Sequence, residues 1–159
     1  MLTRLHPPIA ADERATLDAF LDGARAAIRA SCSGVSDADA RRIALPGSGL
    51  TLCGAVSHLR WAEATWFEVA LRGERDRAPA QDYLADPDVP LAQLLDEYDA
   101  QCALSRSIAA RLSLDTSVAG GGTRYNVRWI LLHMLEETRR LLGLIEAVRE
   151  LLVGDPVAS

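Results

Sequence analysis

The stretch Val127-Arg-Trp-Ile-Leu-Leu-His-Met-Leu-Glu-Glu-Thr-Arg-Arg-Leu-Leu-Gly-Leu-Ile-Glu-Ala-Val-Arg-Glu150 is the clearest indicator of the fold class of this chain. It contains no proline and is rich in residues that favour helix. Its apolar side chains recur at helical spacing and predict one broad apolar face: Ile130, Met134, Leu141, Leu144, Ile145 and Val148. The apolar run continues to Val153, and the following Gly154 and Pro156 end it.

Two residues that can bind a metal ion are set into this helix. His133 and Glu137 are four residues apart, so they lie one turn apart on the same side. Glu137 falls midway between Met134 and Leu141 and therefore interrupts the apolar face. The two side chains could share a metal ion or hydrogen-bond each other. Alternatively, Glu137 forms a surface ion pair with Arg140, which would contribute about 0.3–0.5 kcal/mol.

Three further long helices are predicted from the same helical spacing of apolar residues. They span Asp12 to Ser31, Leu50 to Arg72 and Pro90 to Leu112, and a short helical turn spans Ser36 to Arg42. The candidate N-caps of the first, second and last long helices are Asp12, either Ser48 or Thr51, and Asn126.

The segments between these helices are predicted to be irregular. Residues 1–11 form an arm with two prolines, and residues 74–90 form a polar connection whose length is typical of functional loops. Ser113 to Asn126 is predicted to be a loop, with a flexible turn at its three consecutive glycines. Four long helices, no convincing strand and no internal repeat predict a single all-α domain over residues 1–159. The expected fold is a four-helix bundle with a long connection between the second and third helices.

Composition narrows the classes of function. The chain has 159 residues, a hydrophobic fraction of 49% and a net charge of -5, and such an acidic balance argues against nucleic acid as a partner. No apolar run approaches the ~18 residues of a membrane span, and no signal peptide is evident. Three widely spaced cysteines give no disulfide framework and no thiolate metal site, so we expect reduced thiols in a cytoplasmic protein.

Histidines and carboxylates give the strongest indication of chemistry. His58 and His133 are the two histidines on predicted helices. Facing helices of a bundle could bring them together with Glu137, and three protein ligands plus water would make a catalytic type of metal site. No serine-nucleophile elbow and no HExxH motif competes with this hypothesis.

Two segments carry a resemblance to a known family. They are Leu50-Thr-Leu-Cys-Gly-Ala-Val-Ser-His58-Leu, which continues through Glu63 to Trp66, and Val127-Arg-Trp-Ile-Leu-Leu-His133-Met-Leu-Glu-Glu137-Thr. In these segments and in its order of helices, the chain resembles the DinB/YfiT-like superfamily of metal-binding four-helix bundles. Within that superfamily it is similar to an actinobacterial branch of unknown function related to mycothiol-dependent maleylpyruvate isomerases.

The resemblance implies a metal triad in which this chain lacks one member. The first two ligands of the family fall on His58 and Glu137, but the third falls on Leu141. A further histidine of the family pattern falls on Leu144. The resemblance therefore implies a degraded site that holds no cofactor, or at most a divalent metal such as zinc or nickel, with His133 as a candidate third ligand.

Two hypotheses for function follow from the resemblance. In the first, the chain is a DinB-like protein that binds a small molecule or a partner in the former metal pocket, without nucleic acid or membrane and as a homodimer. In the second, it is a metal-dependent transferase or isomerase that acts on a mycothiol-type thiol. The leucines at positions 141 and 144 favour the first.

Overall fold

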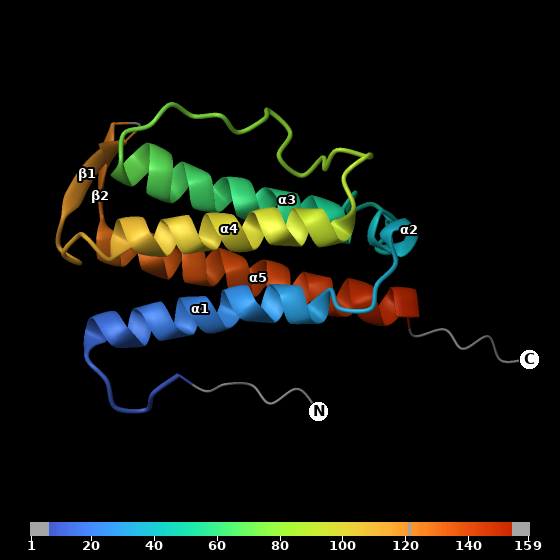
Figure 1. Cartoon of the computed structure of the whole chain (residues 1–159), viewed down its shortest axis with the longest axis horizontal. Coiled ribbons are helices and arrows are strands. Elements are labelled where there is room, and N and C mark those ends of the chain that lie inside the picture. Colours follow the sequence, from blue (N-terminus) through green and yellow to red (C-terminus); the bar gives the residue numbers. More distant parts are fainter. Residues whose placement is uncertain (1–6, 121, 154–159) are drawn as a thin grey trace, which may run out of the picture.

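The computed structural model describes residues 7–120 and 122–153 of the chain, and most of these residues are helical (Figure 1). In that part of the chain the elements are α1 (Glu13–Ser31), α2 (Asp37–Ala40), α3 (Leu52–Glu63), the π-helical segment η1 (Ala64–Leu71), α4 (Leu91–Ala109), β1 (Ser117–Gly120), β2 (Thr123–Asn126) and α5 (Val127–Val153). The prediction of a mostly α-helical chain is confirmed. Residues 1–6 of the predicted arm lie outside the described residues.

Side-chain caps fix the starts of three helices as the sequence predicts. The carboxylate of Asp12 accepts from the backbone N–H of Ala15 at 2.7 Å at the start of α1. Thr51 Oγ1 accepts from Gly54 N–H at 2.9 Å at the start of α3, so Thr51 rather than Ser48 is the cap. Asn126 caps α5 by accepting from the N–H of Trp129 at 2.8 Å. Each cap satisfies a backbone donor that the helix itself leaves unpaired.

The second predicted helix differs from expectation in its second half. Residues 64–71 have π-helical rather than α-helical hydrogen bonding, although Figure 1 shows them continuing the line of α3. A π segment inserts an extra residue per turn and changes which side chains face the core. Phe67 and Glu68 are the buried residues of this segment. The segment has only 8 residues, so its longer period could not be distinguished in the sequence from that of an α-helix.

The predicted absence of strands is wrong, because β1 and β2 form an antiparallel hairpin. Val118 pairs with Tyr125 and Ser117 with Asn126, so the hairpin ends where α5 begins. Gly122 has a φ of +81°, which a residue with a side chain rarely adopts, and this explains a glycine in the turn. Each strand has only four residues, which is too short for an alternating pattern to stand out in the sequence.

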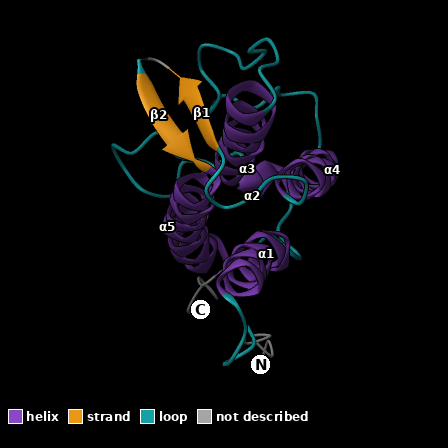
Figure 2. Ribbon diagram, turned by 90° about the vertical axis from the view of Figure 1, so that its left-hand side faces the viewer, coloured by secondary structure: helices purple, strands orange, loops and turns teal. Residues whose placement is uncertain are grey.

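The long helices pack in pairs around the core. α1 lies against α5, and α3 lies against α4, as the end-on view of Figure 2 shows. The buried apolar residues form two clusters. One contains Leu59, Tyr98 and Leu141, and the other contains Phe67, Ile130 and Met134. Cys32, Cys53 and Cys102 are free and buried. No described helix has the length and apolarity needed to cross a membrane.

A buried ion pair joins α1 to the end of α3. The guanidinium of Arg25 donates from Nε and Nη2 to the two carboxylate oxygens of Glu63 at 2.8 and 2.7 Å. Arg25 is 4% exposed and Glu63 is fully buried. Burial alone would lower the pKa of Arg25, but the charge and hydrogen bonds of Glu63, aided by Asp22, outweigh it and raise that pKa.

Candidate functional site

His58 on α3 lies between two carboxylates. Its Nε2 is 3.0 Å from Glu137 Oε1 on α5, and its Nδ1 is 2.9 Å from Asp82 Oδ2 in the connection between η1 and α4. The His58 side chain is 18% exposed, so the ring is largely shielded from water. A neutral imidazole donates to one of these carboxylates, whereas an imidazolium donates to both. The structure thus brings together the two residues, His58 and Glu137, that the sequence put forward as metal ligands.

Glu137 also pairs with Arg140 on the next turn of α5. Arg140 donates from Nε to Glu137 Oε2 at 3.0 Å and from Nη2 to Oε1 at 2.6 Å. Hydrogen bonds from Arg140 hold the pKa of Glu137 below its ordinary value; burial opposes this effect, and His58 reinforces it. Of the alternatives raised for Glu137, the ion pair with Arg140 is realised, and Glu137 also bonds a histidine. The histidine is His58 rather than His133.

The connection over residues 74–90, hereafter the strap, covers this site. In Figure 1 it runs back along α3 between the end of η1 and the start of α4. The Tyr83 ring stacks on the His58 ring with centroids 4.0 Å apart and planes at 11°. The Tyr83 hydroxyl accepts from Arg140 Nη2 at 3.3 Å. Asp82 and Tyr83 are thus site residues that the sequence analysis did not identify. The length of the strap was the signal, but its register on α3 cannot be read from periodicity.

His133 lies in a different environment. Its ring stacks on Trp129 with centroids 5.0 Å apart and meets the edge of Trp66 at 4.9 Å. Tyr125 of the hairpin completes this aromatic cluster by contacting both tryptophans. Among the described residues, His133 makes no hydrogen bond or ion pair with His58 or Glu137. The structure therefore does not bring the third candidate ligand to the other two.

The residues around His58 do not fit the three-ligand metal site that the family resemblance implies. Asp82 and Glu137 lie against different nitrogens of the imidazole, so they cannot join it around one ion. The guanidinium of Arg140 is bonded to Glu137 and would repel a divalent cation there. Leu141, at the third position, is fully buried and has no donor atom. In residues 7–120 and 122–153, no group of three or more histidine, cysteine, aspartate or glutamate side chains is arranged to hold a metal.

A pocket of about 410 Å³ lies beside the His58 site. We call it the leucine pocket, and its lining residues are Leu45, Ser48, Gly49, Leu50, Tyr83, Arg140, Leu141 and Leu144. Both positions at which the family pattern expects histidine, 141 and 144, contribute leucine to its wall. Its volume is within the range of small-molecule sites, and its mix of mostly apolar side chains with a few polar groups is typical of them.

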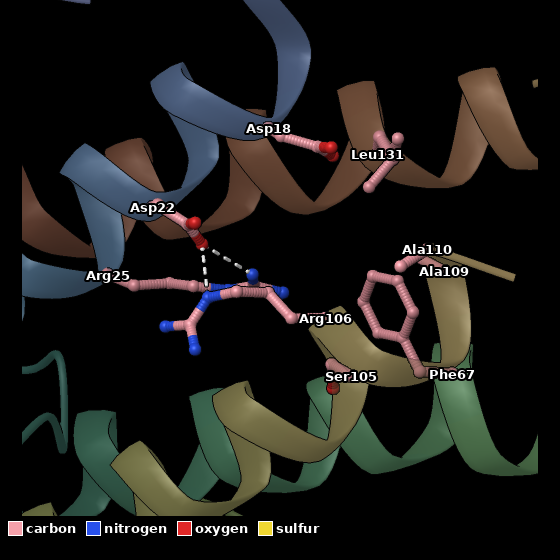
Figure 3. A pocket seen from close by; sticks show the side chains of 9 residues that line it. All are labelled: Asp18, Asp22, Arg25, Phe67, Ser105, Arg106, Ala109, Ala110 and Leu131. Carbon is pink, nitrogen blue, oxygen red and sulfur yellow. Dashed lines mark hydrogen bonds and ion pairs between the residues drawn. The ribbon is translucent and has the colours of Figure 1, made fainter. Parts of the chain in front are cut away.

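A second cavity, of about 150 Å³, lies between α1, α4 and α5 (Figure 3). Asp22 Oδ1 accepts from Arg25 Nη1 at 3.0 Å and from Arg106 Nε at 2.8 Å, as the dashed lines in Figure 3 mark. Phe67 and Leu131 form its apolar side. This cavity is smaller, and its charged groups already neutralise one another. The leucine pocket is therefore the stronger candidate for a ligand.

Comparison with known proteins identifies the family of this chain. The fold is similar to that of a conserved protein from Enterococcus faecalis, with a TM-score of 0.64 and 14% sequence identity, over 92% of this chain and 100% of that one. At that identity the likeness shows the fold alone. A family model described as mycothiol-S-transferase matches residues 16–154, so the chain belongs to the mycothiol S-transferase family, which is DinB-like. A search of curated proteins gives no match.

Proposed function

We propose that this protein binds a small, largely apolar molecule in the leucine pocket and does so without a metal ion. The observation that carries the proposal is the position of Leu141 and Leu144, which line that pocket where the family pattern has histidines. Membership of the mycothiol S-transferase family suggests a ligand related to thiol chemistry, either a thiol or a thiol conjugate. The long helices would serve as the four-helix bundle of the family, with the pocket between α5, the strap and the loop before α3.

Charge balance supports a metal-free site. In the family pattern a metal ion would supply positive charge next to the histidine and glutamate ligands. Here the guanidinium of Arg140 supplies that charge instead, through two hydrogen bonds to Glu137. Arginine stays protonated at any physiological pH, so this positive charge does not depend on metal supply. The charge of Glu137 is therefore compensated without a metal ion.

A metal-dependent thiol transferase is the second candidate, and one observation favours it. Histidine ligands of metal ions usually donate their other ring N–H to a carboxylate. His58 has this arrangement, because its Nδ1 faces Asp82 while its Nε2 faces Glu137. This candidate requires Arg140 to leave Glu137 and a further donor to take the place of Leu141. The metal content of the purified protein distinguishes the two candidates.

Ligand binding tests the first candidate directly. The probe is 2-naphthoate, titrated by NMR into the full chain after treatment with a chelator. The proposal predicts saturable binding that Leu144→Trp abolishes, because the larger ring takes up space that the ligand needs. Leu132→Trp is the matched control, since Leu132 lies on the same helix, is 47% exposed and does not line the pocket. Unchanged binding of the probe by Leu144→Trp would rule out this pocket as its binding site.

We further propose that the protein is a cytoplasmic homodimer. Its three buried cysteines, free of disulfides, fit a reducing compartment. Sedimentation analysis over a range of concentrations tests the oligomeric state, and a single species of 17.2 kDa would contradict it.

A further inference from the structure

Asp82 and Tyr83 hold the strap against the His58 site, beside the leucine pocket. Asp82 bonds His58 Nδ1, and the Tyr83 ring lies on the His58 ring. The Tyr83 hydroxyl bonds Arg140, which already holds Glu137. These contacts join the strap to α3 and to α5 at once. The position of Tyr83 is therefore set by both helices that build the site.

Gly54 on α3 allows the backbone of the strap to come this close. A Cβ atom at position 54 would overlap the backbone carbonyl oxygen of Tyr83 and would stand 3.0 Å from Thr51 Oγ1. The colliding atom belongs to the backbone, so a side-chain rotation could not relieve the overlap. Gly54 is buried inside a helix, where glycine is unfavourable relative to alanine by about 1 kcal/mol. A close approach of the strap is the physical reason for a glycine at this place.

Tyr83 presents a flat surface to the leucine pocket. One face of its ring is covered by His58, so the part that lines the pocket is the other face or the edge. Tyr83 is 38% exposed, so part of this residue is open to a ligand. Leu50 and Leu144, both partly exposed, supply apolar walls. Planar aromatic groups stack well on such a ring, whereas saturated rings of the same size gain only the apolar contact.

Arg140 adds a polar group at the same wall. Its Nε and Nη2 donate to Glu137 and Tyr83, whereas Nη1 has no acceptor among the described residues. Its side chain is 50% exposed and lines the pocket. A ligand with an acceptor oxygen next to its ring could take up these remaining N–H groups.

From these contacts we infer that the leucine pocket selects a flat aromatic ring that carries an acceptor oxygen. Tyr83 is the specificity-determining residue, because its ring stacks on the aromatic ring of the ligand. Gly54 is a positioning residue, because it allows the backbone of the strap to lie close to α3. This inference rests on the proposed function, since it names the chemical class of the ligand for the same pocket. Nothing in it requires a metal or a covalent step.

A matched pair of probes tests the inference. 2-Naphthoate is planar, and decahydro-2-naphthoate has the same carbon skeleton and charge but is saturated. Isothermal titration of the full-length protein should show the planar probe binding about three- to tenfold more tightly. Tyr83→Leu should bring the two affinities to the same value, and Tyr83→Phe should restore the preference. If Tyr83 had only a structural role, Tyr83→Leu would weaken the binding of both probes equally.

Variants of two glycines test the positioning role. Gly54→Ala should shift the strap and reduce the preference for the planar probe. Gly23→Ala is the matched control, because Gly23 also lies inside a helix and a Cβ there meets nothing within 4 Å. The control should keep the full preference. A preference that survives in Gly54→Ala would overturn the role of Gly54.

The remaining outcomes separate this inference from the proposed function. Equal binding of both probes by the unmodified protein, abolished by Leu144→Trp, would overturn the inference while the proposed function stands. A planar preference that persists in Tyr83→Leu would do the same. If neither probe binds the unmodified protein, both the inference and the proposed function are overturned.

Discussion

The buried pair of Arg25 and Glu63 should be the most sensitive polar contact in the fold. Glu63→Gln keeps the size of the side chain but removes its charge, and it leaves the guanidinium of Arg25 without its main counter-ion. The two hydrogen bonds measure 2.8 and 2.7 Å, and the two side chains are 4% and 0% exposed. Breaking one member of a buried pair costs about 3–5 kcal/mol, because an uncompensated charge stays buried.

Thermal and urea unfolding at neutral pH measure this effect. For a chain of this size, a loss of about 3–5 kcal/mol corresponds to a fall in Tm of roughly 6–20 °C. Glu97→Gln is the control, because it breaks the pair with Arg60, whose side chains are about one-third exposed. That change should cost at most about 1 kcal/mol.

A hydrophobic double variant completes the test. Arg25→Met combined with Glu63→Leu should recover much of the stability that Glu63→Gln loses, because neither position then carries a buried charge. Equal losses of stability in Glu63→Gln and Glu97→Gln would mean that burial does not strengthen the Arg25–Glu63 contact.

Two further predictions concern titrating groups. Arg140 lowers the pKa of Glu137 below its ordinary 4.5, so their contact stabilises the fold above that pH and is lost as pH falls through the lowered value. Arg140→Gln should remove this acid-dependent part of the unfolding free energy. Urea unfolding between neutral pH and pH 3 measures it. The control variant Arg139→Gln should retain it. Burial raises the pKa of Cys32 to about 11 and that of Cys102 to about 12, so a thiol reagent at pH 8 should modify them only after unfolding. Fast modification of the native protein would contradict their burial.

Much of the helical framework could be predicted because its signals are local. Asp12 and Asn126 cap their helices as expected, and the start of α5 at Val127 matches its apolar spacing. The place of Glu137 within an apolar face also indicated a carboxylate that needs a partner, and the structure shows it bonded to His58 and Arg140. These features depend on residues within a turn or two of one another.

The rest of the site depends on contacts between distant residues. His133 and His58 are both plausible partners for Glu137 in sequence, and only packing shows that His58 meets it while His133 turns to Trp129. Asp82 and Tyr83 lie in a strap without periodicity, so nothing local fixes which of its side chains reach α3. Position 54 requires a residue without a Cβ atom because the strap backbone lies against it, and no local sequence pattern indicates that contact.

Metal content tests whether Arg140 and two leucines have replaced the metal in this site. The protein, expressed with zinc and nickel in the medium and purified without chelators, is analysed by mass spectrometry for metal per chain. We expect far less than one metal per chain, and no change in His58→Ala. Near-stoichiometric metal in the unmodified protein that His58→Ala abolishes would show that the site still binds a metal and would favour the metal-dependent transferase.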